Sequence, residues 1–134
     1  MTDAQTLPLR RKLVLAREIV TAYVRARWLL RRHDLPHVLR QLRNPPRGRR
    51  PAAAVSDERL ARAVRRTLRT LPADSRCLMQ SLVLTRLLAQ RGRSAILVIG
   101  VSPAGTFTAH AWVEREGLPL LPTHEPEFSR LAEL

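Results

Sequence analysis

Apolar residues recur every three or four positions through the first half of the chain, with arginines between them, and this spacing predicts amphipathic helices. The first predicted helix runs from Leu7 to Arg32, with Pro8 in its first turn, where the missing backbone N–H costs nothing. Asp34 is expected to cap a second, short helix that carries Pro36 in its first turn. The expected apolar stripe of the first helix consists of Leu9, Leu13, Ala16, Val20, Tyr23 and Leu30.

A proline-rich break separates these two helices from the next pair. The stretch from Asn44 to Ala54 holds three prolines, one glycine and three arginines, so it cannot continue a helix. Ser56 is expected to cap a third helix, which ends before Pro72. The apolar stripe of this third helix consists of Leu60, Ala61, Val64, Leu68 and Leu71.

The fourth predicted helix is apolar on most sides, which indicates a central and buried position. Asp74 or Ser75 can cap it, so Cys77 falls in its first turn. Its basic last turn and its C-terminal stop come from Arg91-Gly92. Its apolar residues are Leu78, Met79, Leu82, Val83, Leu84, Leu87 and Leu88.

Beyond this helix the pattern changes to that of strands. Ser94 to Val101 is rich in β-branched residues and predicts a buried strand. A turn at Ser102 to Gly105 leads into a second strand, Thr106 to Arg115, along which the side chains alternate between two faces. One face of this strand carries Thr108, His110, Trp112 and Glu114, and the other carries Phe107, Ala109, Ala111 and Val113.

The end of the chain completes a small sheet. Glu116-Gly117 is predicted to turn the chain into a short third strand, Leu118 to Leu121. The tail, Glu127 to Leu134, is expected to form one or two helical turns. Helices followed by a small antiparallel sheet define the α+β class.

Positive charge is concentrated in the first part of the chain. Residues 1–76 hold 19 Lys and Arg against 6 Asp and Glu, whereas residues 77–134 hold 5 of each kind. We therefore divide the chain into a basic N-terminal helical region, residues 1–55, which ends in a Pro/Arg linker at 44–55, and a core at residues 56–134. A surface for an anionic partner is one interpretation of the basic part, and solvated helix faces are the other.

The sequence argues against a membrane span and against a helix-turn-helix fold that reads DNA. No run of eighteen apolar residues predicts a membrane span, and residues 1–9 lack the layout of a signal peptide. No two helices resemble a helix-turn-helix pair with base-reading residues, so nucleic acid is not expected as a partner. The single cysteine cannot form an internal disulfide, which fits a reducing cytoplasm.

Cys77 at a helix N-terminus and His110 on a later strand form a possible nucleophile–base arrangement. The thiolate is the attacking species, and the unpaired N–H groups and positive end of a helix favour it. The alternative is that Cys77 is a small buried hydrophobe and His110 a satisfied core histidine. The spacing alone leaves both interpretations open.

The residues around this pair extend the pattern over essentially the whole chain. They are Cys77-Leu78, Ser81-Leu82, Leu84, Leu87-Leu88, Arg91-Gly92, Val98-Ile99-Gly100-Val101, Phe107, Ala109-His110-Ala111-Trp112-Val113-Glu114, Gly117 and Pro119. In these residues the chain resembles the transglutaminase-like cysteine peptidases of lasso-peptide biosynthesis, the stand-alone leader peptidases often named the B protein. The resemblance implies a transglutaminase-like (papain-like) core, in which a buried helix bears the cysteine.

The resemblance also implies an activity and its partners. Such peptidases cut the leader from a ribosomally made precursor peptide, which a small separate leader-recognition protein presents. The freed core then passes to an ATP-dependent lasso cyclase. By this similarity Cys77 attacks the scissile carbonyl, and His110 is the general base and then the acid. The chain has no room for a fused recognition domain, so a partner protein is expected.

One position departs from the family pattern. The family usually carries an aspartate about twelve positions after the histidine, where it orients the imidazole, and Pro122 stands at that position here. Glu125 is the nearest carboxylate and is favoured as its replacement. Thr123, His124 or a water molecule are the alternatives. Glu114 shares the face of His110 but lies about 13 Å away along a strand that rises about 3.3 Å per residue, too far for contact.

Two further predictions concern binding. Trp112 lies two residues beyond His110 on the same face, where it can line the substrate groove or pack in the core. No metal or cofactor is expected, since His33, His37 and His124 lack the spacing that would let them bind a metal together with Cys77. The helix that would bring His33 and His37 together is expected to be interrupted between them.

The absence of a Walker-type phosphate loop in the sequence places ATP chemistry in another protein. A second functional hypothesis comes from a different class of protein. It is a non-enzymatic basic helical module that binds an acidic protein or nucleic acid.

Overall fold

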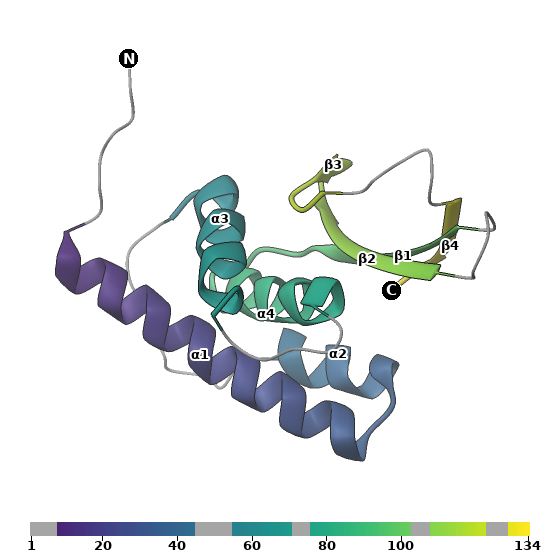
Figure 1. The fold of residues 1–134 in the computed structure, drawn as a ribbon, viewed down its shortest axis with the longest axis horizontal. Coiled ribbons are helices and arrows are strands. Elements are labelled where there is room, and N and C mark those ends of the chain that lie inside the picture. The colour runs from purple at the N-terminus through teal and green to yellow at the C-terminus, as the bar shows by residue number, and fades with distance from the viewer. Residues whose placement is uncertain (1–7, 45–54, 71–75, 103–107, 123–128) are drawn as a thin grey trace.

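A computed structural model describes residues 8–44, 55–70, 76–102, 108–122 and 129–134. In this part of the chain, helices come first and an antiparallel sheet follows, which confirms the predicted α+β class (Figure 1). The elements are α1 (Leu9–Arg32), α2 (Leu35–Arg43), α3 (Asp57–Leu68), α4 (Arg76–Gln90), β1 (Ile96–Ser102), β2 (Thr108–Arg115), β3 (Leu118–Pro119) and β4 (Ser129–Glu133).

Helix α4 lies at the centre of the molecule, as its apolar sequence predicts. It packs against α1, α2 and α3 and also against β1 and β2, so it joins the helical layer to the sheet (Figure 1). A helix in contact with neighbours on all sides must be apolar all round. Its fully buried apolar side chains are Leu82, Val83, Leu84, Leu87 and Leu88. Side chains of α1 and α2 belong to the same hydrophobic cluster as those of α4. The division of the chain at residue 55 stays a prediction.

The predicted caps at Asp34 and Ser56 and the stop at Gly92 are confirmed, whereas Pro8 is the N-cap of α1 and precedes its first turn, and α4 ends at Gln90, before Arg91. The Asp34 carboxylate accepts the N–H of His37 at 3.2 Å, and the Ser56 hydroxyl accepts the N–H of Arg59 at 3.3 Å. Gly92 has φ +70°, and two bonds close the end of α4 there, from the Gly92 N–H to Ala89 O and from the Arg93 N–H to Leu88 O. These two bonds form a Schellman motif, which explains the glycine at this position.

Helix α1 buries a face that overlaps the predicted stripe only in part, since Tyr23 of that stripe is buried but others are not. Of the expected stripe, Leu9 is 73% exposed, Leu13 62% and Val20 40%. The buried residues of α1 are Leu15, Ile19, Ala22, Tyr23, Ala26 and Leu29. The helix has two apolar faces, and the one that packs inward carries two alanines, which let another helix approach closely. The other face stays exposed.

The sheet has the order β3-β2-β1-β4, and its strands are antiparallel. Glu116 at φ 54° and Gly117 at φ 78° form the two-residue turn into β3, as the sequence predicts. In the register of β1 and β2, Gly100 lies opposite His110. Gly100 also pairs with Arg130 of β4, so these residues share one row across three strands.

The predicted helical tail is wrong, because the end of the chain forms strand β4 on the free edge of β1. Leu97 and Leu134 exchange two backbone hydrogen bonds of 2.9 and 2.8 Å. A helix of one or two turns has too few internal hydrogen bonds to be stable alone, whereas an edge strand offers unpaired N–H and C=O groups to pair with. Pairing with the unpaired edge of β1 is therefore the reason that the end of the chain forms a strand.

Several arginines hold the elements together. Arg86 of α4 is only 5% exposed and donates to Leu42 O at 3.1 Å, near the C-terminal end of α2. Arg43 donates to Ala95 O at 3.0 Å and to Leu134 O at 2.7 Å. Partial burial lowers the pKa of Arg43 from its usual value. These side chains join α2 to α4 and to the sheet.

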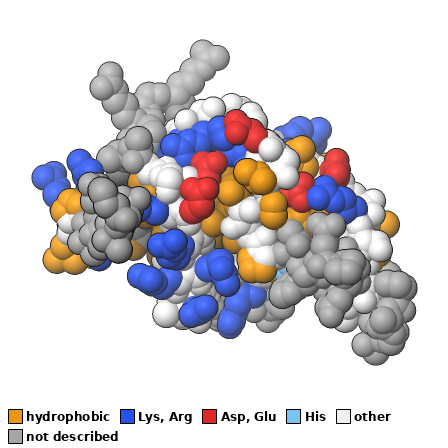
Figure 2. Space-filling view, turned by 90° about the horizontal axis from the view of Figure 1, so that it is seen from above, with side chains coloured by type: hydrophobic (Ala, Val, Ile, Leu, Met, Phe, Trp, Pro, Cys, Tyr) orange, Lys and Arg blue, Asp and Glu red, His pale blue; other side chains and the backbone are white. Residues whose placement is uncertain are grey.

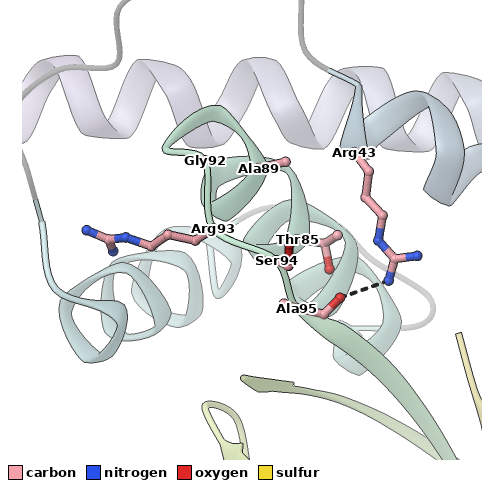
Figure 3. A pocket seen from close by; sticks show the side chains of 7 residues that line it. All are labelled: Arg43, Thr85, Ala89, Gly92, Arg93, Ser94 and Ala95. Atoms are coloured by element: carbon pink, nitrogen blue, oxygen red, sulfur yellow. Dashed lines mark hydrogen bonds between the residues drawn. The ribbon is translucent and has the colours of Figure 1, made fainter. Parts of the chain in front are cut away.

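A pocket of about 260 Å³ lies at the junction of α2, α4 and β1 (Figure 3). Arg43 and Arg93 line it and point away from each other, Arg43 toward Ala95 O and Arg93 toward α3, where it meets Asp57 at 2.8 Å. None of the lining residues is one of the predicted site residues. Among the described helices, none has the combination of length and apolar character that a bilayer crossing requires.

Candidate active site

Cys77 is the second residue of α4 and is half-buried, so the predicted place of the thiol in the first helical turn is confirmed. The first N–H groups of a helix have no partner within it, and they give this end a partial positive charge. The Cys77 carbonyl accepts the hydroxyl of Ser81 at 2.8 Å, and Ser81 O accepts that of Thr85 at 2.8 Å. The predicted caps, Asp74 and Ser75, lie outside the described residues.

His110 lies on β2, as predicted, and its side chain is half-buried. Helix α4 packs against β2, so the element that carries the thiol and the element that carries the imidazole are neighbours. Gly100, directly opposite His110 on β1, adds no side chain to the sheet face on which the imidazole stands. At this position of the register the imidazole therefore has no side chain of β1 opposite it.

The Nε2 atom of His110 lies 2.6 Å from the carbonyl oxygen of Pro122. A carbonyl only accepts hydrogen bonds, so Nε2 carries the hydrogen and donates it. Pro122 is twelve residues after His110, the position at which the resemblance leads us to expect an aspartate. Sequence reasoning compared side chains and missed this group, because every residue of a chain has a carbonyl and the pattern gives no signal for one of them.

Trp112 forms one flank of the imidazole. Its indole is fully buried, and its ring lies 5.8 Å from that of His110 at an interplanar angle of 29°. The indole N–H donates to a carboxylate oxygen of Glu114 at 2.9 Å. The burial agrees with a packing role, and the predicted contact of Trp112 with a substrate stays a prediction.

Trp112 is held in place by Glu114, which is itself paired with Arg130. Glu114 is only 6% exposed, and both of its oxygens accept from the Arg130 guanidinium, one of them at 3.0 Å. The paired geometry is typical of strong arginine–carboxylate interactions. As the sequence predicts, Glu114 serves a different partner from His110. The role of Arg130 was missed, because it depends on the tail forming β4.

The remaining predicted site residues are either outside the described part of the chain or on other elements. Glu125, the favoured orienting group, and its alternatives Thr123 and His124 lie outside the described residues. The expected separation of His33 and His37 is wrong, since their rings stack at 4.1 Å. The helix does break between them, but the capping turn at Asp34 brings the two rings together. Within the described ranges, no three His, Cys, Asp or Glu side chains gather as metal ligands would.

Comparison with known proteins gives one match. The family described as the transglutaminase-like superfamily matches residues 20–133. No curated protein and no solved structure matches the chain. The matched range includes Cys77, His110 and the strands around them.

Proposed function

The chain belongs to the transglutaminase-like superfamily, and from this premise we propose that it is a cysteine peptidase that removes the leader from a ribosomally made lasso precursor peptide. Members of this superfamily are commonly cysteine peptidases or transferases. The observation that carries the proposal is the placement of a half-buried thiol in the first turn of α4 and of an oriented imidazole on β2, the strand that α4 packs against. Acyl transfer through a thioester needs these two groups.

In the proposed reaction His110 takes the proton of the Cys77 thiol, and the sulfur attacks the carbonyl carbon of the last leader residue. The C–N bond to the core peptide breaks, and the imidazolium gives its proton to the departing amine. Water, deprotonated by the same imidazole, then attacks the thioester carbon. The C–S bond breaks, the imidazolium returns its proton to the sulfur, and the leader leaves as a carboxylic acid. Each step moves one proton through His110, so neither a metal nor an oxidant takes part.

The negative oxygen that forms in each attack needs hydrogen-bond donors. The backbone N–H groups in the first turn of α4 have no acceptor within the helix, and they lie beside the sulfur. Donors of this kind act strongly because they are fixed before the reaction begins. We assign the Cys77 N–H to this role.

The proposed partners are a small leader-recognition protein, which presents the precursor, and a cyclase that receives the core. The exposed apolar face of α1 supports a docking surface for the recognition protein. Leu13, Val24 and Trp28 are 62%, 58% and 51% exposed on it. Arg10 and Arg17 are exposed on the same helix, so the complementary surface is apolar with acidic residues around it. We place the reaction in the cytoplasm, where a lone thiol stays reduced.

Cleavage of the precursor tests the peptidase. With the recognition protein present, mass spectrometry of the products is expected to show free leader and free core with the wild-type chain and neither with Cys77→Ala. The matched control is Thr70→Ala, an exposed residue beyond α3, which leaves the rate unchanged. Undiminished cleavage by Cys77→Ala would rule out this thiol as the nucleophile.

A binding module without enzymatic activity is the second candidate, and the arginines of α3 favour it. Arg62, Arg65 and Arg66 are exposed on this helix. Figure 2 shows basic side chains outnumbering acidic ones on the described part of one face. This function predicts binding to an anionic partner that weakens with salt and persists in Cys77→Ala. The absence of such binding at low salt would remove it.

A further inference from the structure

We propose that the main-chain carbonyl of Pro122 is the positioning group of His110, in the place where relatives use a carboxylate side chain. The distance of 2.6 Å between Nε2 and the carbonyl oxygen is that of a short, well-formed hydrogen bond. The role in catalysis rests on the proposed peptidase function. The tautomer and orientation of the imidazole do not depend on that function, and both can be measured without any substrate.

The segment that presents this carbonyl is held to the sheet from two directions. The N–H of Leu120 donates to Val113 O at 2.8 Å, which continues the pairing of the chain with β2. Leu121 is only 4% exposed and belongs to the core cluster, so it anchors the residue before the proline. The pyrrolidine ring fixes φ of Pro122 and narrows the directions in which its carbonyl can point.

The hydrogen bond determines the tautomer of His110. With the hydrogen on Nε2, the neutral imidazole has Nδ1 as its basic nitrogen, and this atom accepts the proton of a nucleophile. A carbonyl keeps the ring in this tautomer and orientation as an aspartate would. It is neutral, however, so it stabilises the imidazolium less than a carboxylate does. The carbonyl therefore takes the orienting role that the sequence suggested for Glu125.

Nitrogen-15 NMR of the imidazoles tests the tautomer directly. The chain has four histidines, and loss of one set of signals in His110→Gln assigns the resonances of His110. At a pH where this ring is neutral, we expect its Nε2 to be protonated, with a proton shifted downfield and protected from exchange. A Nδ1–H tautomer, or an unprotected Nε2 proton, overturns the proposal.

Two substitutions separate the carbonyl from the carboxylate. Glu125→Gln is expected to leave both the Nε2 proton signal and kcat within about twofold of wild type, whereas removal of a true orienting carboxylate costs on the order of 10⁴-fold in kcat in the serine-protease triad. Loss of the protected Nε2 proton in Glu125→Gln, or a fall of kcat beyond tenfold, assigns the role to Glu125 and overturns the proposal.

Changes at residue 122 itself provide the positive test. Pro122→Ala keeps the carbonyl but removes the ring that fixes φ, so we expect a loss of the protected proton signal and of kcat that is smaller than in the glycine variant. Pro122→Gly frees the backbone, and we expect a weaker Nε2 proton signal together with a fall of about tenfold in kcat and little change in KM. Equal behaviour of the two variants contradicts the proposal. If no variant, wild type included, cleaves the precursor, the peptidase function fails, while the NMR result still decides the tautomer.

Discussion

The imidazole of His110 is constrained by three neighbours of different chemical kinds. The Pro122 carbonyl accepts its hydrogen, the buried indole of Trp112 stacks beside it, and Gly100 places no side chain opposite it on β1. A general base must be held in both orientation and tautomer, and we propose that the backbone and the packing of the strands contribute to both for His110.

Enlarging Gly100 tests whether activity depends on the lack of a side chain opposite His110 on β1. Gly100→Val puts a branched side chain in the row between His110 and Arg130, and we expect kcat to fall by about tenfold because a small displacement of a catalytic group has large effects. The matched control is Val101→Ile, the same strand one residue on, which we expect to retain activity. Circular dichroism checks that both variants are folded, and full activity in folded Gly100→Val would contradict the idea.

Some of these residue contributions follow from the sequence and others do not. The positions of Cys77 in a first helical turn and of His110 on a strand follow from caps and alternation, which are local. The contact with Pro122 depends on how the chain returns after β3 and on a group that every residue has. The pairing of Glu114 with Arg130 depends on strand order, which is a property of the whole sheet.

At the scale of elements, β4 connects the end of the chain to the support of the site. Through this strand Arg130 reaches across β1 to Glu114, which in turn holds Trp112 beside His110. Local pattern favours a helical turn in the tail, and the open edge of β1 overrides it. The same limit explains why the buried face of α1 matches the predicted stripe only in part, since periodicity identifies two apolar faces and only the packing against neighbours selects one.

Removing Arg130 is expected to destabilise the protein. In Arg130→Leu the nearly buried Glu114 carboxylate loses its charged partner, and the free energy of unfolding falls by about 1–3 kcal/mol, as is usual for a buried group left unsatisfied. Urea unfolding measures the change. Arg66→Leu, an exposed arginine of α3, is the control and should stay within about 0.5 kcal/mol of wild type. The double variant Glu114→Gln with Arg130→Leu should recover part of the loss, and an additive result would contradict the pairing.

At the scale of the whole molecule, basic charge and an exposed apolar face occur together on α1. Trp28 is half exposed, and the guanidinium of Arg32 lies 4.7 Å from its ring centre. Tryptophan and arginine are the side chains that most often dominate binding energy at interfaces. The face opposite to it packs into the core.

Substitution on this face tests the proposed docking of the recognition protein. Leu13→Glu combined with Trp28→Glu is expected to weaken binding by at least about tenfold, because it removes apolar area and repels an acidic surface. Leu118→Glu, a residue of β3 that is 67% exposed, is the matched control and should bind as wild type does. Isothermal titration calorimetry measures both. Equal affinities of the double variant and the control would exclude α1 as the docking site.

The bond from His110 to a main-chain carbonyl also determines what genetics can detect. Every substitution at residue 122 keeps a main-chain carbonyl there, so an alanine scan does not remove the acceptor. The side chain is therefore not what evolution must preserve to keep this hydrogen bond. A carboxylate in the same place would be visible at once, since one mutation removes it. Replacing the carbonyl oxygen of residue 122 with sulfur by chemical synthesis alters the acceptor alone. An essential part of a catalytic site can in this way leave no trace in the list of side chains.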